Sequence, residues 1–310
     1  MMAAVAALGG CKFEPGDAVG AAPPGEADAS QILPDAAPPR RDAAVPDAMP
    51  PPPDSEVPPD DAVHLLLSEV KTQPNAEEFV EIFNPLGADE SLDGYFLSDD
   101  RDYGLLPATG DVAVGGGDAV LRFPAGSTIA AGQVIVIALD EEGFRDAFGR
   151  DADYALVPAS DPVAAEMVRV ADATRIMDIT DIAEPIALFR WDGATDLVID
   201  VDIVFVGNEA PDAGADNAMF DKSGVEVDGP DPDDRASQYA ADGAQMAPMA
   251  FRATNGGSYQ RIALEAGHEP RGGDGNGVDG HDETSEDTAA TWGQEDAPPT
   301  PGEVAAALRP

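Results

Sequence analysis

Short apolar runs broken by turn-forming residues constrain the fold of this chain more than any other feature. The first runs lie at 65–70, 79–84 and 95–97, and they are separated by Gln73-Pro74-Asn75 and by Asn84-Pro85-Leu86-Gly87. Proline lacks the N–H that a strand ladder needs and glycine favours turns, so both residue types end strands. Similar runs follow at 112–114, 119–123, 133–139, 167–170, 186–191, 197–205, 257–264 and 289–292. The pattern predicts an all-β fold.

The clearest two-residue period lies at 197–205. The odd-numbered residues from Leu197 to Phe205 are all apolar, whereas the even-numbered residues include Asp200 and Asp202. Successive side chains of a strand point to opposite faces of its sheet. We therefore expect the odd-numbered face to pack into a core and the even-numbered face to meet water.

Two short helices are also expected. Asp140 can cap the first, in which Phe144 and Phe148 are spaced so as to share one helix face. The second is expected near 234–241, inside a polar region.

The charge of the chain excludes some partners. Asp and Glu total 60 against 17 Lys and Arg, which gives a formal net charge of −43. Such a surface repels phosphate backbones, and the sequence holds no basic run beyond Arg40-Arg41. We expect no nucleic-acid partner. Calcium and basic proteins suit the surface better, although acidity also serves solubility alone.

Residues 1–11 resemble the end of a bacterial lipoprotein signal peptide. Leu8-Gly9-Gly10-Cys11 fits a lipobox, in which the cysteine accepts the lipid and becomes the mature N-terminus. The apolar part is short and no basic residue precedes it, as in a signal peptide that has lost its first half. Cys11 is the single cysteine, so no intramolecular disulfide can form. We expect lipidation at Cys11 and a location in the cell envelope, as an outer-membrane lipoprotein or a secreted protein.

The rest of the chain divides by composition. Residues 12–62 are rich in Pro, Ala and Asp and are expected to form a disordered tether, because they offer little apolar surface to bury. One β-sandwich domain is expected at 63–302, with a polar surface insertion at 207–255, and 303–310 is expected to be a C-terminal tail.

Several motifs in the domain resemble those of the lamin tail domain family. They are LLLSEV, EFVEIFNP, LDGYFLSD, RFPAGSTIAAGQVIVIA, EPIALFRWDGATDLVIDVDIVF, GGSYQRI and TWGQEDAPPTPG, in that order. The resemblance implies an immunoglobulin-like β-sandwich and a non-enzymatic binding or scaffolding role. Glu69 and Glu81 fall on the strand motifs, and we interpret them as paired or hydrogen-bonded structural carboxylates near a sheet edge.

The loop GGDGNGVDGHDETSED is the clearest candidate for a metal site. Its hard oxygen ligands and glycines suit calcium, although its spacing departs from the EF-hand pattern. The alternative is a solvated loop whose Asp and Gly residues make turns. The candidate ligands are Asp274, Asn276, Asp279, Asp282, Glu283 and Asp287.

An enzymatic role is not expected. The sequence has no Gly-x-Ser-x-Gly elbow and no His-Glu-x-x-His motif, and we judge its histidines, His64, His268 and His281, too scattered for a metal or catalytic cluster. We therefore expect a monomeric, non-catalytic binding or structural module of the cell envelope, with an envelope or extracellular protein or glycan as partner and no cofactor. The alternatives are a calcium-stabilised adhesion or recognition module and a carboxylate-dependent hydrolase.

Overall fold

The computed structural model describes residues 64–110, 117–170, 177–180, 183–207, 221–243, 256–265, 268–269, 275–293 and 297–309. The expected lipobox with Cys11, the tether at 12–62 and the strand at 112–114 lie outside these residues. No helix among the described residues is both long and apolar enough to cross a membrane.

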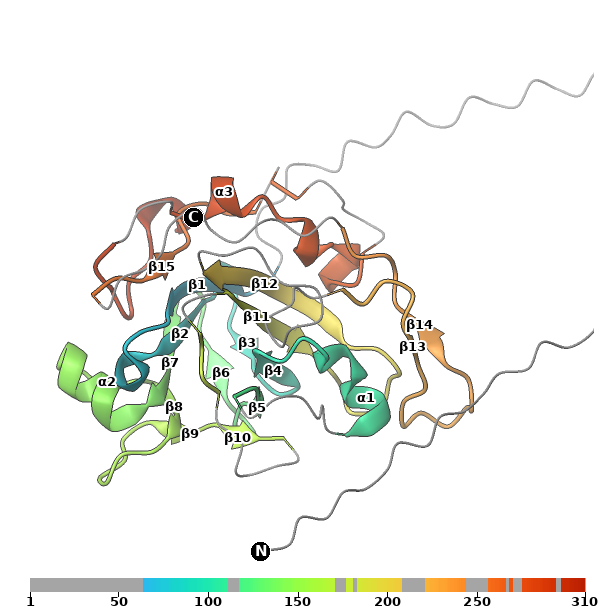
Figure 1. The fold of residues 1–310 in the computed structure, drawn as a ribbon, viewed down its shortest axis with the longest axis horizontal. Helices are drawn as coiled ribbons and strands as arrows, with labels where there is room; N and C mark the ends of the chain where they lie inside the picture. Colours follow the sequence, from blue (N-terminus) through green and yellow to red (C-terminus); the bar gives the residue numbers. More distant parts are fainter. Residues whose placement is uncertain are drawn as a thin grey trace, which may run out of the picture. The chain divides into compact units, whose positions relative to one another are not determined.

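A six-stranded sheet contains the opening strands of the domain (Figure 1). All its neighbours pair antiparallel except β7–β8 and β8–β9, which are parallel. In order across the sheet the strands are β15 (Tyr259–Gln260), β1 (Leu66–Lys71), β2 (Phe79–Phe83), β7 (Val134–Asp140), β8 (Tyr154–Val157) and β9 (Ala165–Glu166).

A five-stranded antiparallel sheet forms the second layer. Its strands in order are β10 (Val168–Arg169), β5 (Val120–Arg122), β4 (Tyr95–Ser98), β11 (Ala183–Arg190) and β12 (Ile199–Gly207). Two small ribbons complete the β structure, namely β3 (Glu90–Ser91) with β6 (Thr128–Ile129), and β13 (Glu226–Val227) with β14 (Ser237–Gln238).

The main hydrophobic core lies between the two sheets. Val80 and Ile137 of the six-stranded sheet belong to the same buried cluster as Leu97, Leu188 and Val204 of the five-stranded sheet. Apolar faces of two sheets that share one core define a β-sandwich. The all-β sandwich expected from the strand pattern is therefore confirmed.

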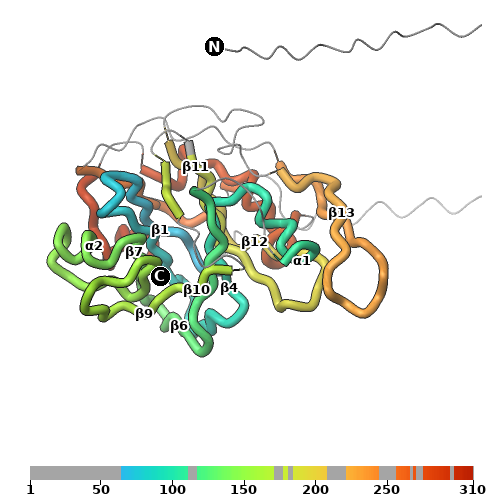
Figure 2. The backbone as a smooth tube through the Cα atoms, turned by 60° about the horizontal axis from the view of Figure 1, so that its bottom comes forward, coloured from blue at the N-terminus to red at the C-terminus, as the bar shows by residue number. Residues whose placement is uncertain are grey.

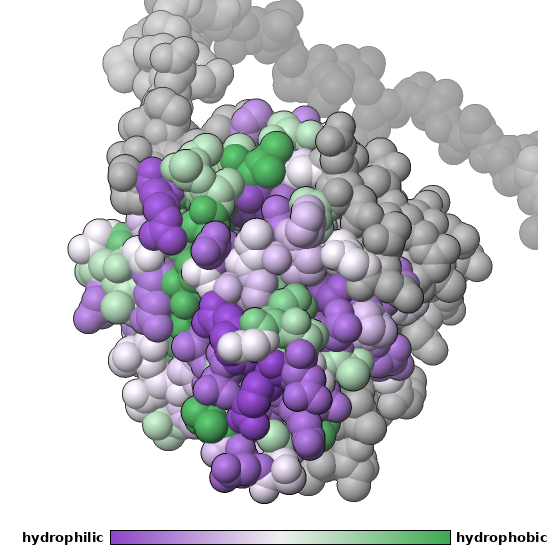
Figure 3. Space-filling view, turned by 90° about the vertical axis from the view of Figure 1, so that its left-hand side faces the viewer, coloured by the Kyte–Doolittle hydropathy of each residue, from purple (hydrophilic) through white to green (hydrophobic). Residues whose placement is uncertain are grey.

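A second buried cluster lies on the outer side of the five-stranded sheet, where Phe96 stacks on Phe189 with ring centroids 5.2 Å apart. The ribbon β13–β14 lies on this side of the domain. In both Figure 1 and Figure 2 it lies at the opposite end of the domain from the helix that follows β7. Figure 3 shows the face that lies on the left-hand side of Figure 1, and hydrophilic and hydrophobic residues are intermingled on it.

Strand β12 departs from the expected pattern of one buried and one wet face. Asp202 is fully buried and Asp200 nearly so, while Val204 and Val206 on the supposed wet face pack into the main core. Ile203 and Val198 pack into the second cluster instead. The irregular register between Leu188 and Phe189 shifts the alternation within the strand. The expectation that Asp200 and Asp202 meet water was wrong, because β12 is covered on both faces.

The helices are few and short: α1 (Leu106–Thr109), α2 (Glu141–Phe148) and α3 (Thr288–Thr291). Helix α2 is the one expected after Asp140, whose carboxylate accepts hydrogen bonds from Glu142 N and Gly143 N. The expected helix at 234–241 and the expected strand at 289–292 were both wrong. Residues 234–241 contain strand β14 rather than a helix, and 289–292 form helix α3 and its C-cap Trp292 rather than a strand.

Two segments expected at the periphery contribute to the interior. Lys222 and Tyr239, from the described part of the 207–255 region, are almost fully buried. Leu308 is fully buried, and the Arg309 guanidinium lies 5.8 Å from the Phe83 ring. The described part of 207–255 therefore does not lie wholly at the surface, and Leu308 and Arg309 pack on the sandwich.

Candidate functional site

The most heavily charged part of the interior surrounds Arg261, which follows β15. Its side chain is fully buried. Nη2 donates to Asp202 Oδ2 at 2.8 Å, Nη1 donates to Glu286 Oε1 at 2.6 Å, and Nε donates to the Leu67 carbonyl at 2.7 Å. The guanidinium also lies over the Trp292 ring, 4.9 Å from its centroid. One side chain thus joins β1, β12 and the segment around α3.

Two histidines and two glutamates adjoin this group. His64 Nε2 lies 3.1 Å from Glu265 Oε2 and 3.7 Å from Glu283 Oε1. The rings of His64 and His281 meet edge to face with centroids 5.8 Å apart. The expectation that the histidines are too scattered for a cluster was wrong for this pair, because residues 64 and 281 meet when the C-terminal segment packs beside β1. We call His64, Glu265, His281 and Glu283 the histidine cluster.

Burial and neighbouring charges act against each other in the histidine cluster. Burial alone would lower the pKa of His64, but Glu265 and Glu283 raise it well above its usual value. Burial opposes ionisation of Glu265, yet His64 and Arg261 lower the pKa of this carboxyl to about 2. For Glu283 burial prevails and raises the pKa well above the usual range. The fold therefore holds more carboxylates here than its own cations balance.

A second buried network links the 207–255 region to the sandwich. Lys222 Nζ donates to Asp200 Oδ2 and to Tyr103 Oη, both at 2.8 Å. Tyr103 Oη in turn donates to Asp200 Oδ1 at 2.6 Å. A buried carboxylate is tolerated when it is paired and hydrogen-bonded in this way. Lys222 therefore allows β12 to carry a buried Asp200.

A third cluster contains only acidic groups. Asp99 follows β4, Asp118 precedes β5 and Glu184 lies in β11, and one carboxylate oxygen of each lies within 4.8 Å of the others. Burial, with a further contribution from Asp99, raises the pKa of Glu184 to about 10. Asp99 accepts from Ala119 N through Oδ1, while its buried Oδ2 has no hydrogen-bond partner among the described residues. We call these three residues the acidic triad.

Glu69 and Glu81 face each other across the β1–β2 pair. Glu69 accepts from Ser258 Oγ at 2.5 Å and from Thr300 N at 3.0 Å, and Glu81 accepts from Ser68 Oγ at 2.7 Å and from Gly302 N at 2.6 Å. The interpretation of both as hydrogen-bonded structural carboxylates is confirmed. They tie the C-terminal segment to the sheet.

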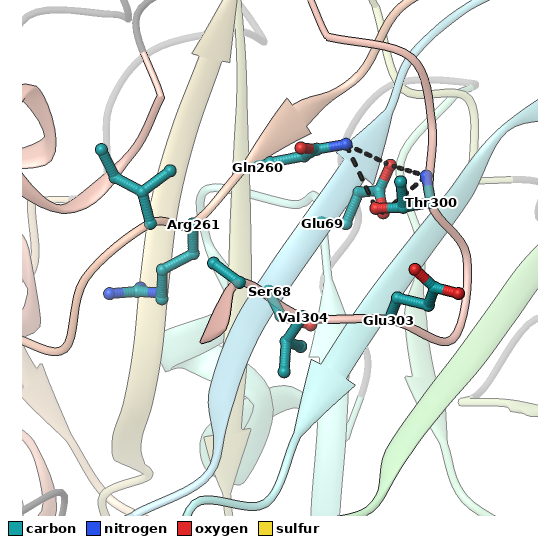
Figure 4. A pocket seen from close by; sticks show the side chains of 9 residues that line it. Ser68, Glu69, Gln260, Arg261, Thr300, Glu303 and Val304 are labelled. Carbon is teal, nitrogen blue, oxygen red and sulfur yellow. Dashed lines mark hydrogen bonds between the residues drawn. The ribbon is translucent and has the colours of Figure 1, made fainter. Parts of the chain in front are cut away.

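A cavity of about 220 Å³ lies beside Glu69, between β1, β15 and the C-terminal segment (Figure 4). Glu69, Gln260 and Thr300 are joined by hydrogen bonds along one side of it, and Glu303 and Val304 line it as well. The lining groups that carry charge are thus largely occupied by bonds within the fold.

Among the described residues, the proposed calcium ligands do not gather into one set of close carboxylate oxygens. Asn276 donates to the Ala240 carbonyl and to Asp242 Oδ1, Asp279 is exposed, and Asp282 Oδ1 accepts from Thr284 Oγ1. Asp287 is the N-cap residue of α3, and Asp274 lies outside the described residues. Glu283 alone among these ligands belongs to a set of close metal-ligand atoms in the described part of the chain, and its neighbours there come from other segments.

No model of a known protein family matches the chain, and no curated protein does. A solved structure of a DUF4876 family protein from Bacteroides thetaiotaomicron is similar to it at 16% identity and a TM-score of 0.45, over 80% of this chain and 75% of that protein. This likeness is too distant to carry an argument about function.

We expect the stability of the fold to decrease as the pH rises when no divalent metal is present. Burial raises the pKa of Glu81 from its usual value near 4.5 to about 8, and the facing Glu69 adds to the rise. The folded state therefore holds a proton that the unfolded chain has lost. The stabilisation is complete below about pH 4.5 and is lost as the pH rises through 8, at a slope on the order of 1 kcal/mol per pH unit. Urea unfolding between pH 5 and 9 with a chelator measures it.

The variant Glu81→Gln tests the assignment, because glutamine keeps an acceptor for Gly302 N and does not titrate. Its unfolding free energy should depend less on pH than that of the wild type, while Glu142→Gln, at an exposed position of α2, should leave the slope unchanged. Equal slopes in wild type and Glu81→Gln would contradict the assignment.

Proposed function

We propose that this chain is a non-catalytic binding or structural module displayed on the bacterial cell envelope, with an immunoglobulin-like sandwich of the lamin tail type. The observation that carries the proposal is that the buried charged side chains form ion pairs with one another inside the fold. In the interior, Arg261 forms ion pairs with Asp202 and Glu286, and Lys222 forms one with Asp200. Groups so occupied stabilise a scaffold, whereas acid–base catalysis needs groups that reach a substrate.

A shallow groove at the end of the β11–β12 hairpin is the surface best suited to a ligand. It has a volume of about 250 Å³ and is lined by Arg190, Trp191, Asp192 and Ile199, among others. Trp191 Nε1 donates to the Thr195 carbonyl at 2.9 Å, which fixes the indole ring. Ile199 is 45% exposed. A fixed, half-exposed aromatic ring beside charged side chains suits the flat faces and hydroxyls of a sugar. The partner we propose here is an envelope or extracellular glycan.

Envelope display depends on Cys11. When the native gene is expressed with its upstream region, we expect the protein in the membrane fraction and a lipid-modified Cys11 at its N-terminus by mass spectrometry. The variant Cys11→Ser should keep residues 1–10 and leave the membrane fraction, because serine offers no thiol for acylation. A wild-type chain that stays in the soluble fraction with an unmodified N-terminus would contradict display.

Glycan binding at the groove is tested separately. We expect the purified protein to bind isolated cell-wall polysaccharide in a sedimentation assay, and Trp191→Ala to reduce the affinity at least tenfold because the stacking surface is lost. Val163→Ala is the matched control, since Val163 is 65% exposed and does not line the groove. Equal retention of wild type and Trp191→Ala would exclude the groove as the binding site.

The acidic triad favours a second candidate, a calcium-stabilised recognition module. Calcium takes carboxylate oxygens at 2.3–2.6 Å. The triad offers three buried carboxylates, and Asp99 Oδ2 has no hydrogen-bond partner in the described part of the chain. This location differs from the 274–287 loop that the sequence suggested.

For this candidate we expect calcium in about 100-fold excess over its Kd to raise Tm by about 5 °C. Asp99→Asn should abolish the increase, because asparagine keeps the acceptor for Ala119 N but removes the charge. The same increase in wild type and Asp99→Asn would place any calcium elsewhere.

A further inference from the structure

We propose that the histidine cluster is a binding site for a first-row transition-metal dication of the zinc type. One ring nitrogen each of His64 and His281 and one oxygen of Glu283 lie within 4.8 Å of one another. Glu265 Oε2 adjoins the same His64 nitrogen. This site is independent of the function proposed above and of the acidic triad.

The two spacings from His64 Nε2 to the glutamate oxygens are close to those between ligands of a tetrahedral site. Zinc binds histidine nitrogen and carboxylate oxygen at about 2.0–2.2 Å, so two ligands of a tetrahedral site lie about 3.4 Å apart. His64 Nε2 lies 3.1 Å from Glu265 Oε2 and 3.7 Å from Glu283 Oε1.

The outer contacts of the two histidines fit metal binding. His64 Nδ1 donates to the Leu65 carbonyl at 2.9 Å, so Nε2 is the nitrogen that would give up its proton and bind a metal through its lone pair. His281 Nδ1 lies 2.5 Å from Glu269 Oε2. Metal-binding histidines almost always engage their other ring nitrogen with a carbonyl or a carboxylate in this way, which fixes the tautomer and the ring orientation.

Glu283 supplies an independent indication of a ligand. Its side chain is 2% exposed, and Oε1 has no hydrogen-bond partner among the described residues. His64 Nε2 lies 3.7 Å from this oxygen, beyond hydrogen-bond distance. A buried carboxylate oxygen without a donor is costly unless a proton or a metal occupies it.

Charge favours a dication at this position. Arg261 pairs with three buried carboxylates, those of Asp202, Glu265 and Glu286. A fourth buried carboxylate, Glu283, lies beside Asp202 and Glu265. A divalent cation at the histidine cluster would offset the excess negative charge and allow Glu283 to ionise. The two imidazole ligands favour zinc and related metals over calcium, which prefers an all-oxygen set.

The test uses the full chain with Cys11→Ser, without a histidine tag, because a free thiol and a tag both bind zinc. After dialysis against a chelator and its removal, we expect one zinc ion per chain by calorimetric titration and an increase in Tm. Cobalt at the site should give the visible absorption of a tetrahedral complex and should be displaced by zinc.

Variants separate this site from zinc bound at the surface. His281→Gln and Glu283→Gln should each weaken zinc binding at least 100-fold and remove the cobalt absorption. Glu269→Gln, which changes only the outer contact, should weaken binding 10–100-fold. His268→Gln is the matched control and should bind zinc as the wild type does, since His268 is not in the cluster.

The proposal is overturned if the wild type takes up no zinc, or if His281→Gln binds it as tightly as the wild type. It is also overturned if the cobalt complex has the weak absorption of an octahedral ion, which would show that the metal is not held in a four-coordinate site. If the wild type takes up no zinc, the cluster is instead a buried imidazolium paired with glutamates.

Discussion

The fully buried guanidinium of Arg261 is the interaction on which the rest of the domain depends. A charge in the interior is tolerated only when it is paired and hydrogen-bonded, and the loss of one partner costs about 3–5 kcal/mol. Arg261 obtains its partners from Asp202 in β12, Glu286 near α3 and the Leu67 carbonyl in β1. The strand that opens the domain, the last strand of the five-stranded sheet and the C-terminal segment are thus fixed relative to one another. Asp202 of β12 is buried for this reason, although the residues around it alternate as they would in a strand with one solvent-exposed face.

A chain with 60 acidic and 17 basic residues must stabilise buried carboxylates mostly without its own cations. The structure shows several solutions. Backbone and hydroxyl donors serve Glu69 and Glu81, and Lys222 serves Asp200. Glu184 has a pKa near 10, so a proton keeps it neutral. A proton and a metal ion are alternative solutions to the same deficit of positive charge, which is why the histidine cluster and the acidic triad are the two positions where bound cations are to be sought.

The fold could be predicted from the sequence further than the sites could. Strand positions follow from local pattern, and the cap at Asp140 needs only its neighbours in the chain, so both were predictable. The sites combine residues that are distant in sequence: His64 with His281, and Asp99 with Glu184. A single sequence carries no signal for such pairings. The alternation at 197–205 was misleading because period two reports which residues share a face, not whether a neighbouring segment covers that face.

One signal in the sequence could have pointed to the buried charges. Val201-Asp202-Ile203-Val204-Phe205 places an aspartate within an otherwise apolar run, and a strand buried on both faces reads as a near-continuous apolar run. An aspartate in that setting requires a cation or a donor from elsewhere in the chain. Arg261 is one of 17 basic residues and lies within the strand motif at 257–264, which made it a reasonable partner on chemical grounds. The identity of the remaining partners depended on how the C-terminal segment returns to the first strand, and that path is set by tertiary packing rather than by local sequence.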